Sequence, residues 1–288
     1  MDLRRYINRS SQIERVRDLA LRGLFFYQPF IFTDTLQTGV GLEFENEEFD
    51  GLIYWPDCPD EHLKNESFSR FLVDNKQYEI FKSANNRLRV TYEYFIDEIC
   101  VAVGDVERTT FVDVGTNLGY FPVSLAKRGA LKTVGFDSVD YSETFSFLNS
   151  LLHTNSEFHF GAYSPEKMVI PRCGKYDVAI AMHVLTHLSD PLHFLNFLGT
   201  TARKAVFLWN HVSENNDNMA ITHGDSNRYY PENPFPFSFD FDTRLSVKLL
   251  YRCFELMGFR DIREIQIPEG GLIPKTQYEH KAFLAIRR

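Results

Sequence analysis

The feature that most constrains the fold is an alternation of short apolar runs with longer amphipathic runs, which begins near residue 109. The short runs have the length and composition of buried strands, and the runs between them have the spacing of helices. This alternation is typical of successive βα units on a mostly parallel sheet. Seven strands are predicted: "TTFVDV", "LKTVGF", "SEFHFG", "YDVAIAM", "KAVFLW", "DIREIQI" and "KAFLAI". Four helices are predicted between them: "LGYFPVSLAKRG", "YSETFSFLNSLL", "DPLHFLNFLGTTA" and "TRLSVKLLYRCFELMG".

The last two predicted strands are separated only by a loop at 268–279, which predicts a closing antiparallel hairpin. Residues 1–105 follow a different pattern, with a helical start, a strand-like stretch and a helix from about 76 to 103. We therefore predict an α/β domain over 106–288 and an N-terminal α+β cap over 1–105. A segment at 211–241 is too long for an ordinary connection, so it is a candidate lid or pocket wall.

Composition and charge narrow the class of protein. The chain has 44% hydrophobic and 24% charged residues, which is ordinary for a folded globular protein. Its formal charge of -8 makes nucleic acid an unfavoured partner. We expect a cytoplasmic protein without a membrane span, because no apolar run is long enough and the first residues lack a signal-peptide pattern. The four cysteines lack C-x-x-C spacing, which argues against a structural zinc site and a disulfide framework.

A glycine-containing segment, "DVGTNLG", separates the first of the seven strands from its helix. Glycine lets the backbone turn sharply there, and the amide groups at a helix N-terminus bind negatively polarised ligands. The segment is neither the dehydrogenase G-x-G-x-x-G pattern nor a phosphate-binding loop. The next strand ends in an acid, Asp137.

Together these features resemble the class I S-adenosylmethionine-dependent methyltransferases over roughly residues 109–288. The resemblance implies a Rossmann-like seven-stranded sheet and S-adenosylmethionine as the cofactor. It implies that the loop holds the amino acid part of the cofactor and that Asp137 holds the two ribose hydroxyls, to which a carboxylate can bind. The chain departs from many members at Ala162 and Tyr163, where an acid usually binds adenine. The candidate cofactor residues are Asp113, Gly115, Asn117, Gly119, Tyr120, Asp137, Ser138, Ala162, Tyr163 and Met182.

Two local similarities fall within this superfamily. The segment "GKYDVAIAMHVLTHLSDP" is similar to the branch that carboxymethylates the wobble uridine of tRNA. The glycine loop also resembles that of methyltransferases acting on sugars and macrolides. Neither similarity is long enough to identify a substrate.

Methyl transfer needs a nucleophile held in line with the methyl group, and a base helps when the nucleophile is a hydroxyl or a protonated amine. His183 and His211 follow the fourth and fifth strands, where substrates lie in such folds, so both are candidate bases. The alternative for each is a hydrogen-bonding residue that shapes the pocket. Candidate substrate residues are Asn210, Arg228, Tyr229, Tyr230 and Tyr27.

Histidines close in sequence raise the question of a metal. His183, His187 and His193 are near one another, but no acid or thiol completes a ligand set, so no metal site is predicted. Alternate phenylalanines in "PENPFPFSFDF" form an aromatic face if the segment is extended. That face either packs against the core or a second copy of the chain in a homodimer, or lines the substrate pocket.

The preferred function is O- or N-methylation of a small molecule, because two accessory segments enclose the site and the charge does not suit RNA. A tRNA-modifying methyltransferase or carboxymethyltransferase is the first alternative, and an inactive binding protein of the same fold is the second. The tRNA alternative predicts an unpaired basic strip formed by Arg4, Arg5, Arg9, Arg15, Arg17 and Arg22.

Overall fold

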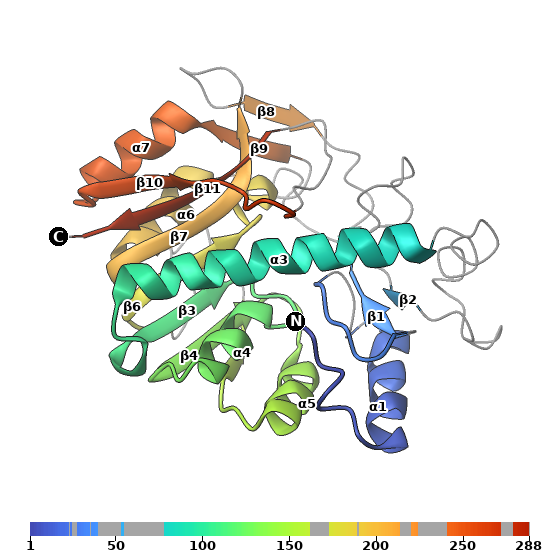
Figure 1. Ribbon diagram of the computed structural model, residues 1–288. Helices are drawn as coiled ribbons and strands as arrows, with labels where there is room; N and C mark the ends of the chain where they lie inside the picture. The colour runs from blue at the N-terminus through green and yellow to red at the C-terminus, as the bar shows by residue number, and fades with distance from the viewer. Residues whose placement is uncertain are drawn as a thin grey trace.

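The computed structural model describes residues 1–22, 24, 28–34, 36–39, 53–54, 78–161, 173–188, 190–213, 220–223, 241–271 and 279–287. Its centre is a sheet in which the order of seven strands is β10-β11-β7-β6-β3-β4-β5 (Figure 1). No helix in these ranges is long and apolar enough to cross a membrane.

All seven predicted strands are present. Five run parallel: β3 (Thr110–Val114), β4 (Lys132–Asp137), β5 (Glu157–Phe160), β6 (Tyr176–Met182) and β7 (Ala202–Ser213). β11 (Glu279–Ile286) pairs antiparallel with β7, and β10 (Asp261–Ile265) pairs antiparallel with β11. The predicted closing hairpin is therefore confirmed.

Two further strands extend the sheet beyond the prediction. β9 (Phe241–Ser246) pairs with β8 (Ala220–His223) and runs parallel to the end of β7. β6 ends opposite Trp209, so the last residues of β7 keep a free side where β9 pairs at Val212 and Ser213. The sequence prediction of a helix from residue 243 was therefore wrong for its first turn. Helix α7 (Val247–Leu256) begins only after Ser246, whose hydroxyl accepts a hydrogen bond from the Leu249 amide.

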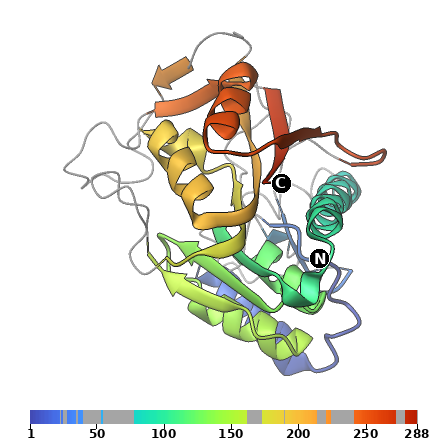
Figure 2. The ribbon, with the colours of Figure 1, turned by 90° about the vertical axis from the view of Figure 1, so that its left-hand side faces the viewer.

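Helices cover both faces of the sheet and bury a hydrophobic core on each. α3 (Tyr78–Val103), α4 (Tyr120–Lys127) and α5 (Ser142–Leu152) share one core, which includes Phe207 and Trp209 of β7. α6 (Pro191–Thr201) and α7 share the other, which includes Val206 and Leu208. The alternation along β7 follows from the two-residue period of a strand. Figure 2 shows α3 end-on, with α6 on the other side of the sheet.

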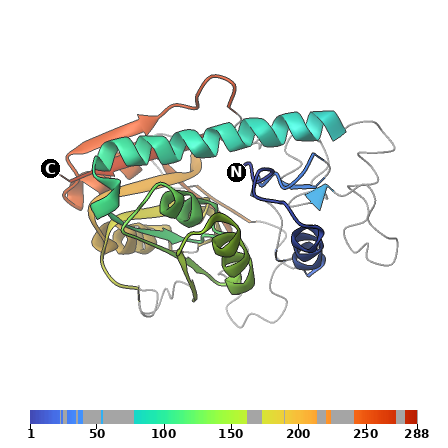
Figure 3. The same cartoon turned by 60° about the horizontal axis from the view of Figure 1, so that its bottom comes forward.

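The N-terminal part contains α1 (Ser10–Leu21), β1 (Gln37–Thr38) and β2 (Ile53–Tyr54), which lie beside one end of α3 (Figures 1 and 3). α3 itself packs on the sheet, since the ring centroid of Phe95 lies 5.1 Å from that of Phe207 and 5.2 Å from that of Trp209. The domain boundary predicted after residue 105 stays a prediction. Helix α3, which ends just before this boundary, packs against the core of the sheet.

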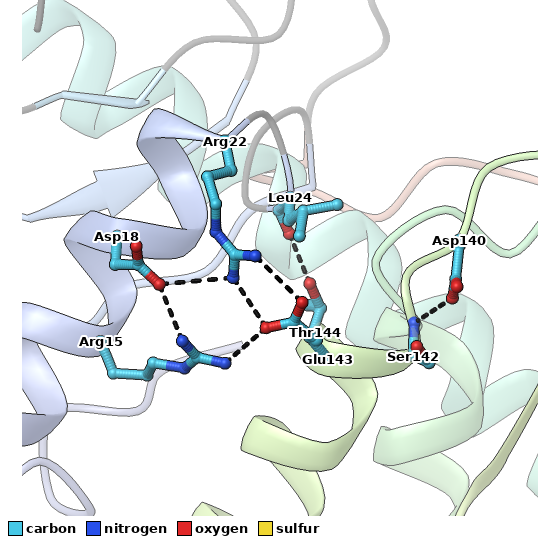
Figure 4. A network of polar contacts seen from close by, with 8 residues as sticks. All are labelled: Arg15, Asp18, Arg22, Leu24, Asp140, Ser142, Glu143 and Thr144. Carbon is cyan, nitrogen blue, oxygen red and sulfur yellow. Dashed lines mark hydrogen bonds and ion pairs between the residues drawn. The ribbon is translucent and has the colours of Figure 1, made fainter.

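Arginines of the N-terminal part pair with acids. In Figure 4, Arg15 and Arg22 both contact Asp18 of their own segment and Glu143 of α5, with Arg15 Nη2 2.6 Å from Glu143 Oε2. Arg4 pairs with Asp2 and Asp34, and Arg17 pairs with Glu14. Four of the six arginines of the expected basic strip are therefore neutralised by neighbours, which corrects the expectation of an unpaired strip.

Candidate functional site

The loop between β3 and α4 has a backbone that requires glycine. Gly115 and Gly119 have φ values of 73° and 85°, and Asn117 has a φ of 51°. A Cβ added to Gly115 would lie 2.4 Å from Cγ2 of Val184, and one added to Gly119 would lie 2.4 Å from the ring of Phe145. Both glycines are therefore fixed by close packing as well as by the left-handed backbone.

Asp137, at the end of β4, is bonded to this loop. Its Oδ2 accepts a hydrogen bond from the Asn117 amide at 2.8 Å, and its Oδ1 accepts one from the Val139 amide at 3.0 Å. Burial raises the pKa of Asp137, while bonds from Val139, Asn117 and Ser138 oppose the rise. A carboxylate has about four lone-pair sites, so two ligand hydroxyls would bind Asp137 by taking the places of the Ser138 bonds, while the bonds from the Asn117 and Val139 amides remain.

Asp113, at the start of the loop, is 2% exposed. Its Oδ2 accepts a bond from the Thr116 hydroxyl at 2.9 Å, whereas its Oδ1 has no partner among the described residues. Burial, with a further contribution from the charge of Asp137, raises the pKa of Asp113 to about 7. Because buried polar atoms are nearly always bonded, this oxygen suits a donor that a ligand would supply.

Gln28 is a loop contact that the sequence did not predict. Its Nε2 donates to the Thr116 carbonyl at 3.1 Å, and its Oε1 accepts from the Tyr120 amide at 3.0 Å. The residue is 7% exposed, so the N-terminal part seals the loop and the start of α4 from behind. A single glutamine in an apolar stretch gives no sequence signal for this role.

Neither Tyr120 nor Met182, which were both predicted to bind the cofactor, has an exposed side chain. Tyr120 is fully buried, and its hydroxyl donates to Oε1 of Glu93 in α3 at 2.8 Å. Its ring packs at 5.0 Å from that of Tyr92, so the side chain belongs to the core and only its amide belongs to the loop. Met182 is half-buried at the end of β6, opposite Trp209.

Two exposed apolar side chains flank Asp137. Phe160 is 69% exposed and lies in register with Asp137 on the neighbouring strand, and Val139 is 40% exposed two residues after it. Ser138, between Asp137 and Val139, is also exposed. Exposed apolar groups beside a carboxylate suit a flat apolar ring attached to a polyhydroxyl group. No sequence pattern points to Phe160, because only its exposure in the folded chain distinguishes it from a core residue.

Three histidines meet at the carboxyl edge of β6 and β7. His183 follows β6 and donates its backbone amide to the Trp209 carbonyl at 2.7 Å. Its ring centroid lies 5.2 Å from that of His211 and 4.9 Å from that of His280. His211 and His280 are register partners on β7 and β11, with centroids 4.2 Å apart. The structure thus joins both predicted bases and adds His280, which the sequence analysis missed.

Burial, with smaller contributions from His280, His211 and His187, holds the pKa of His183 well below its usual value. Asn210 is next to His211 but is 2% exposed, and its Nδ2 donates to the His211 carbonyl at 3.1 Å. Because neighbouring residues of a strand face opposite sides, Asn210 does not join the three histidines. The remaining predicted site residues lie outside the described residues: Tyr27, Ala162, Tyr163, Arg228, Tyr229 and Tyr230, as do Phe235, Phe237 and Phe239 of the aromatic segment.

Parts of this chain are similar in sequence to known methyltransferases. A family model described as a methyltransferase domain matches residues 86–264. A tRNA U34 carboxymethyltransferase of Campylobacter jejuni is 30% identical over 110 residues, which cover 37% of this chain and 36% of the relative. A ubiquinone biosynthesis O-methyltransferase of Nitrosomonas europaea is 34% identical over 106 residues, which cover 37% of this chain and 42% of the relative. The match therefore spans well under half the length of these relatives.

Among solved structures, the N-terminal domain of EvdMO1 with SAH bound is similar in fold. It has a TM-score of 0.51 and 16% identity, and the similarity covers 67% of this chain and 79% of that chain. At this identity the likeness supports the fold alone.

Proposed function

The chain belongs to the methyltransferase domain family matched over residues 86–264, and from that premise we propose that it methylates an oxygen or nitrogen atom of a small molecule. The cofactor is S-adenosylmethionine, which supplies a methyl group on a positively charged sulfur. The enzyme's task is to hold the acceptor atom in line with that methyl group and to exclude water.

One observation carries the cofactor part of the proposal: the Asp137 carboxylate is bonded to the Asn117 amide of the glycine loop. Asp137 would bind the two ribose hydroxyls, and the bare oxygen of Asp113 fits the cationic amino group of the methionine part. Phe160 and Val139 would contact adenine through their exposed apolar surfaces. Gln28 would keep the loop in place by binding the Thr116 carbonyl and the Tyr120 amide.

The acceptor would lie over the carboxyl ends of β6 and β7, beside the cofactor loop. His183 and His211 stand at that edge, and each stays a predicted proton acceptor for a hydroxyl substrate. The edge is close to the loop because Val184, one residue after His183, packs against Gly115.

Charge supports a small acceptor over a nucleic acid. The chain carries a formal charge of -8, and four of the six arginines of the expected basic strip are paired with acids. A polyanion binds through several unpaired cations whose counterions are released. These arginines are therefore poorly placed to bind a phosphate backbone.

The relatives favour one alternative. tRNA U34 carboxymethyltransferases match part of this chain, so transfer of a carboxymethyl group to tRNA is a second candidate. That candidate predicts tRNA binding that weakens steeply as salt rises. It also predicts a preference for a carboxylated form of the cofactor. Membership of the methyltransferase domain family favours an enzyme over an inactive binding protein.

The deciding experiment is calorimetric titration of the chain with S-adenosylmethionine and with S-adenosylhomocysteine, followed by transfer assays with isotopically labelled methyl groups. Acceptor panels of phenols, sugars and amines would be run beside unmodified tRNA. Micromolar cofactor binding and label in a small acceptor support the proposal. Label in tRNA alone supports the alternative, and no binding of either cofactor form contradicts both.

A further inference from the structure

Three imidazoles from distant parts of the chain converge at one point of the sheet edge. His183 follows β6, His211 lies near the end of β7, and His280 lies near the start of β11. A nitrogen of each lies within 4.8 Å of a nitrogen of the other two. Among the described residues, these three histidines are close enough to one another to bind a single metal ion.

The convergence has a backbone cause. His211 and His280 are opposite each other in the antiparallel ladder between β7 and β11, so their side chains leave the same face of the sheet. His183 reaches that face through a left-handed backbone, with a φ of 56°, which is rare for a residue with a side chain. The hydrogen bond from its amide to the Trp209 carbonyl holds it there. Strained backbone of this kind often accompanies a functional group that must point in one direction.

A purely structural role leaves one atom unexplained. Nε2 of His183 is buried and has no hydrogen-bond partner among the described residues. An imidazole that only filled the core would be expected to bond both of its nitrogens. A ligand that accepts lone pairs from several nitrogens at once would satisfy it.

We propose that His183, His211 and His280 form a site for one divalent transition metal ion, with Zn²⁺ as the ion that best suits three imidazoles. Three protein nitrogens with a fourth position open is the arrangement of catalytic zinc sites. Nitrogens around a tetrahedral zinc lie ~3.3 Å apart, so the separations here need to close by at most about 1.5 Å. Side-chain rotation supplies this, because the backbones of His211 and His280 are already register partners.

This site departs from the sequence analysis, which grouped His183 with His187 and His193 and predicted no metal. The imidazole of His193 instead contacts the carboxylate of Asp190 at the start of α6. His280 completes the set, and it also lines a hollow of about 300 Å³ that is formed by residues 264–267 and 279–282.

The metal site deepens the proposed function, and its catalytic role rests on that function. An acceptor hydroxyl bound at the open position would lose its proton to water more readily, because the metal lowers its pKa. The oxygen then forms a bond to the methyl carbon as the carbon–sulfur bond breaks, and the electron pair stays on the sulfur of S-adenosylhomocysteine. The three imidazoles would act as ligands in place of the imidazole base predicted from the sequence.

The test is metal binding by the metal-free full chain, measured by calorimetry with Zn²⁺ and by the visible absorption of Co²⁺ in its place. His280→Ala removes one ligand, and His280→Gln does so while keeping a polar side chain. His153→Asn is the matched control, because His153 is an exposed histidine that ends α5 in a left-handed conformation suited to asparagine. Thermal unfolding and titration with S-adenosylmethionine accompany each variant.

We expect one Zn²⁺ per chain, a tetrahedral Co²⁺ spectrum, and an affinity that falls more than about 100-fold in both His280 variants but not in His153→Asn. Absence of Zn²⁺ binding by the folded chain overturns the site. Binding that survives equally in folded His280→Gln also overturns it. The cofactor titration separates the two proposals, since metal binding without cofactor binding would leave the site standing and refute the proposed function.

Discussion

The carboxylate of Asp137 accepts a hydrogen bond from the backbone amide of Asn117, with an oxygen-to-nitrogen distance of 2.8 Å. This bond joins the end of β4 to the loop after β3 and so holds the two halves of the candidate cofactor site together. The neighbouring bond to the Val139 amide fixes the rotation of the carboxylate.

Replacing Asp137 with alanine should weaken binding of S-adenosylmethionine by on the order of 2 kcal/mol, or about 30-fold, because two hydroxyl bonds to a charged acceptor are lost. Calorimetric titration measures the change. Asp105→Ala is the control, because Asp105 is an exposed acid at the opposite edge of the sheet. Equal affinities of the Asp137 variant and the parent chain would show that the ribose does not bind there.

Gly119→Ala should destabilise the fold more than Gly258→Ala. Both positions have positive φ, at 85° and 87°, so both variants suffer backbone strain of about 1 kcal/mol. Only the Cβ at position 119 meets another group, the Phe145 ring at 2.4 Å, whereas position 258 has open space. Overpacking adds roughly 1–3 kcal/mol. Urea unfolding of the two variants measures the difference, and similar losses would mean that the loop relaxes freely.

In the Asp113→Asn variant, the free energy of unfolding should fall less as pH rises than it does in the parent chain. The pKa of Asp113 is raised to about 7 in the folded chain, while an unfolded aspartate titrates near ~3.9. Between these values the folded chain keeps a proton that the unfolded chain releases, so stability falls as pH rises and then levels off above pH ~7. We expect the fall between pH ~5 and ~8, measured without cofactor, to be smaller in the variant by on the order of 2 kcal/mol. Parallel pH profiles would contradict this origin.

Gln28→Met should lower both stability and cofactor affinity. The thioether fills a similar volume but bonds neither group: the Thr116 carbonyl keeps its bond from the Gly119 amide, whereas the buried Tyr120 amide loses its acceptor at a cost of roughly 1–3 kcal/mol. Thermal unfolding and cofactor titration report the two effects. Gln266→Met is the control, because Gln266 is exposed and its side-chain amide donates to the side chain of Glu264 in β10, away from the loop. A stable variant with unchanged affinity would show that the loop keeps its shape without Gln28.

The sequence by itself determined the seven central strands, the glycine loop and Asp137. Each depends on short-range physics: the two-residue and 3.6-residue periods, the freedom of glycine at positive φ, and the position of an acid directly after a strand. The first turn of the helix predicted from residue 243 failed for the opposite reason, because Leu245 and Ser246 pair with the end of β7 and Thr243 and Arg244 pair with β8. Local helix preference lost to a backbone pairing that the sequence does not reveal.

Only the tertiary structure decided which side chains meet. The antiparallel register of β7 and β11 sets His280 against His211, although β8, β9, α7 and β10 lie between them in the chain. Packing of α3 turned Tyr120 into the core toward Glu93, and folding of the N-terminal part brought Gln28 to the loop. Contacts between distant segments depend on strand register and on the orientation of packed faces, and the local pattern of residues predicts neither of them.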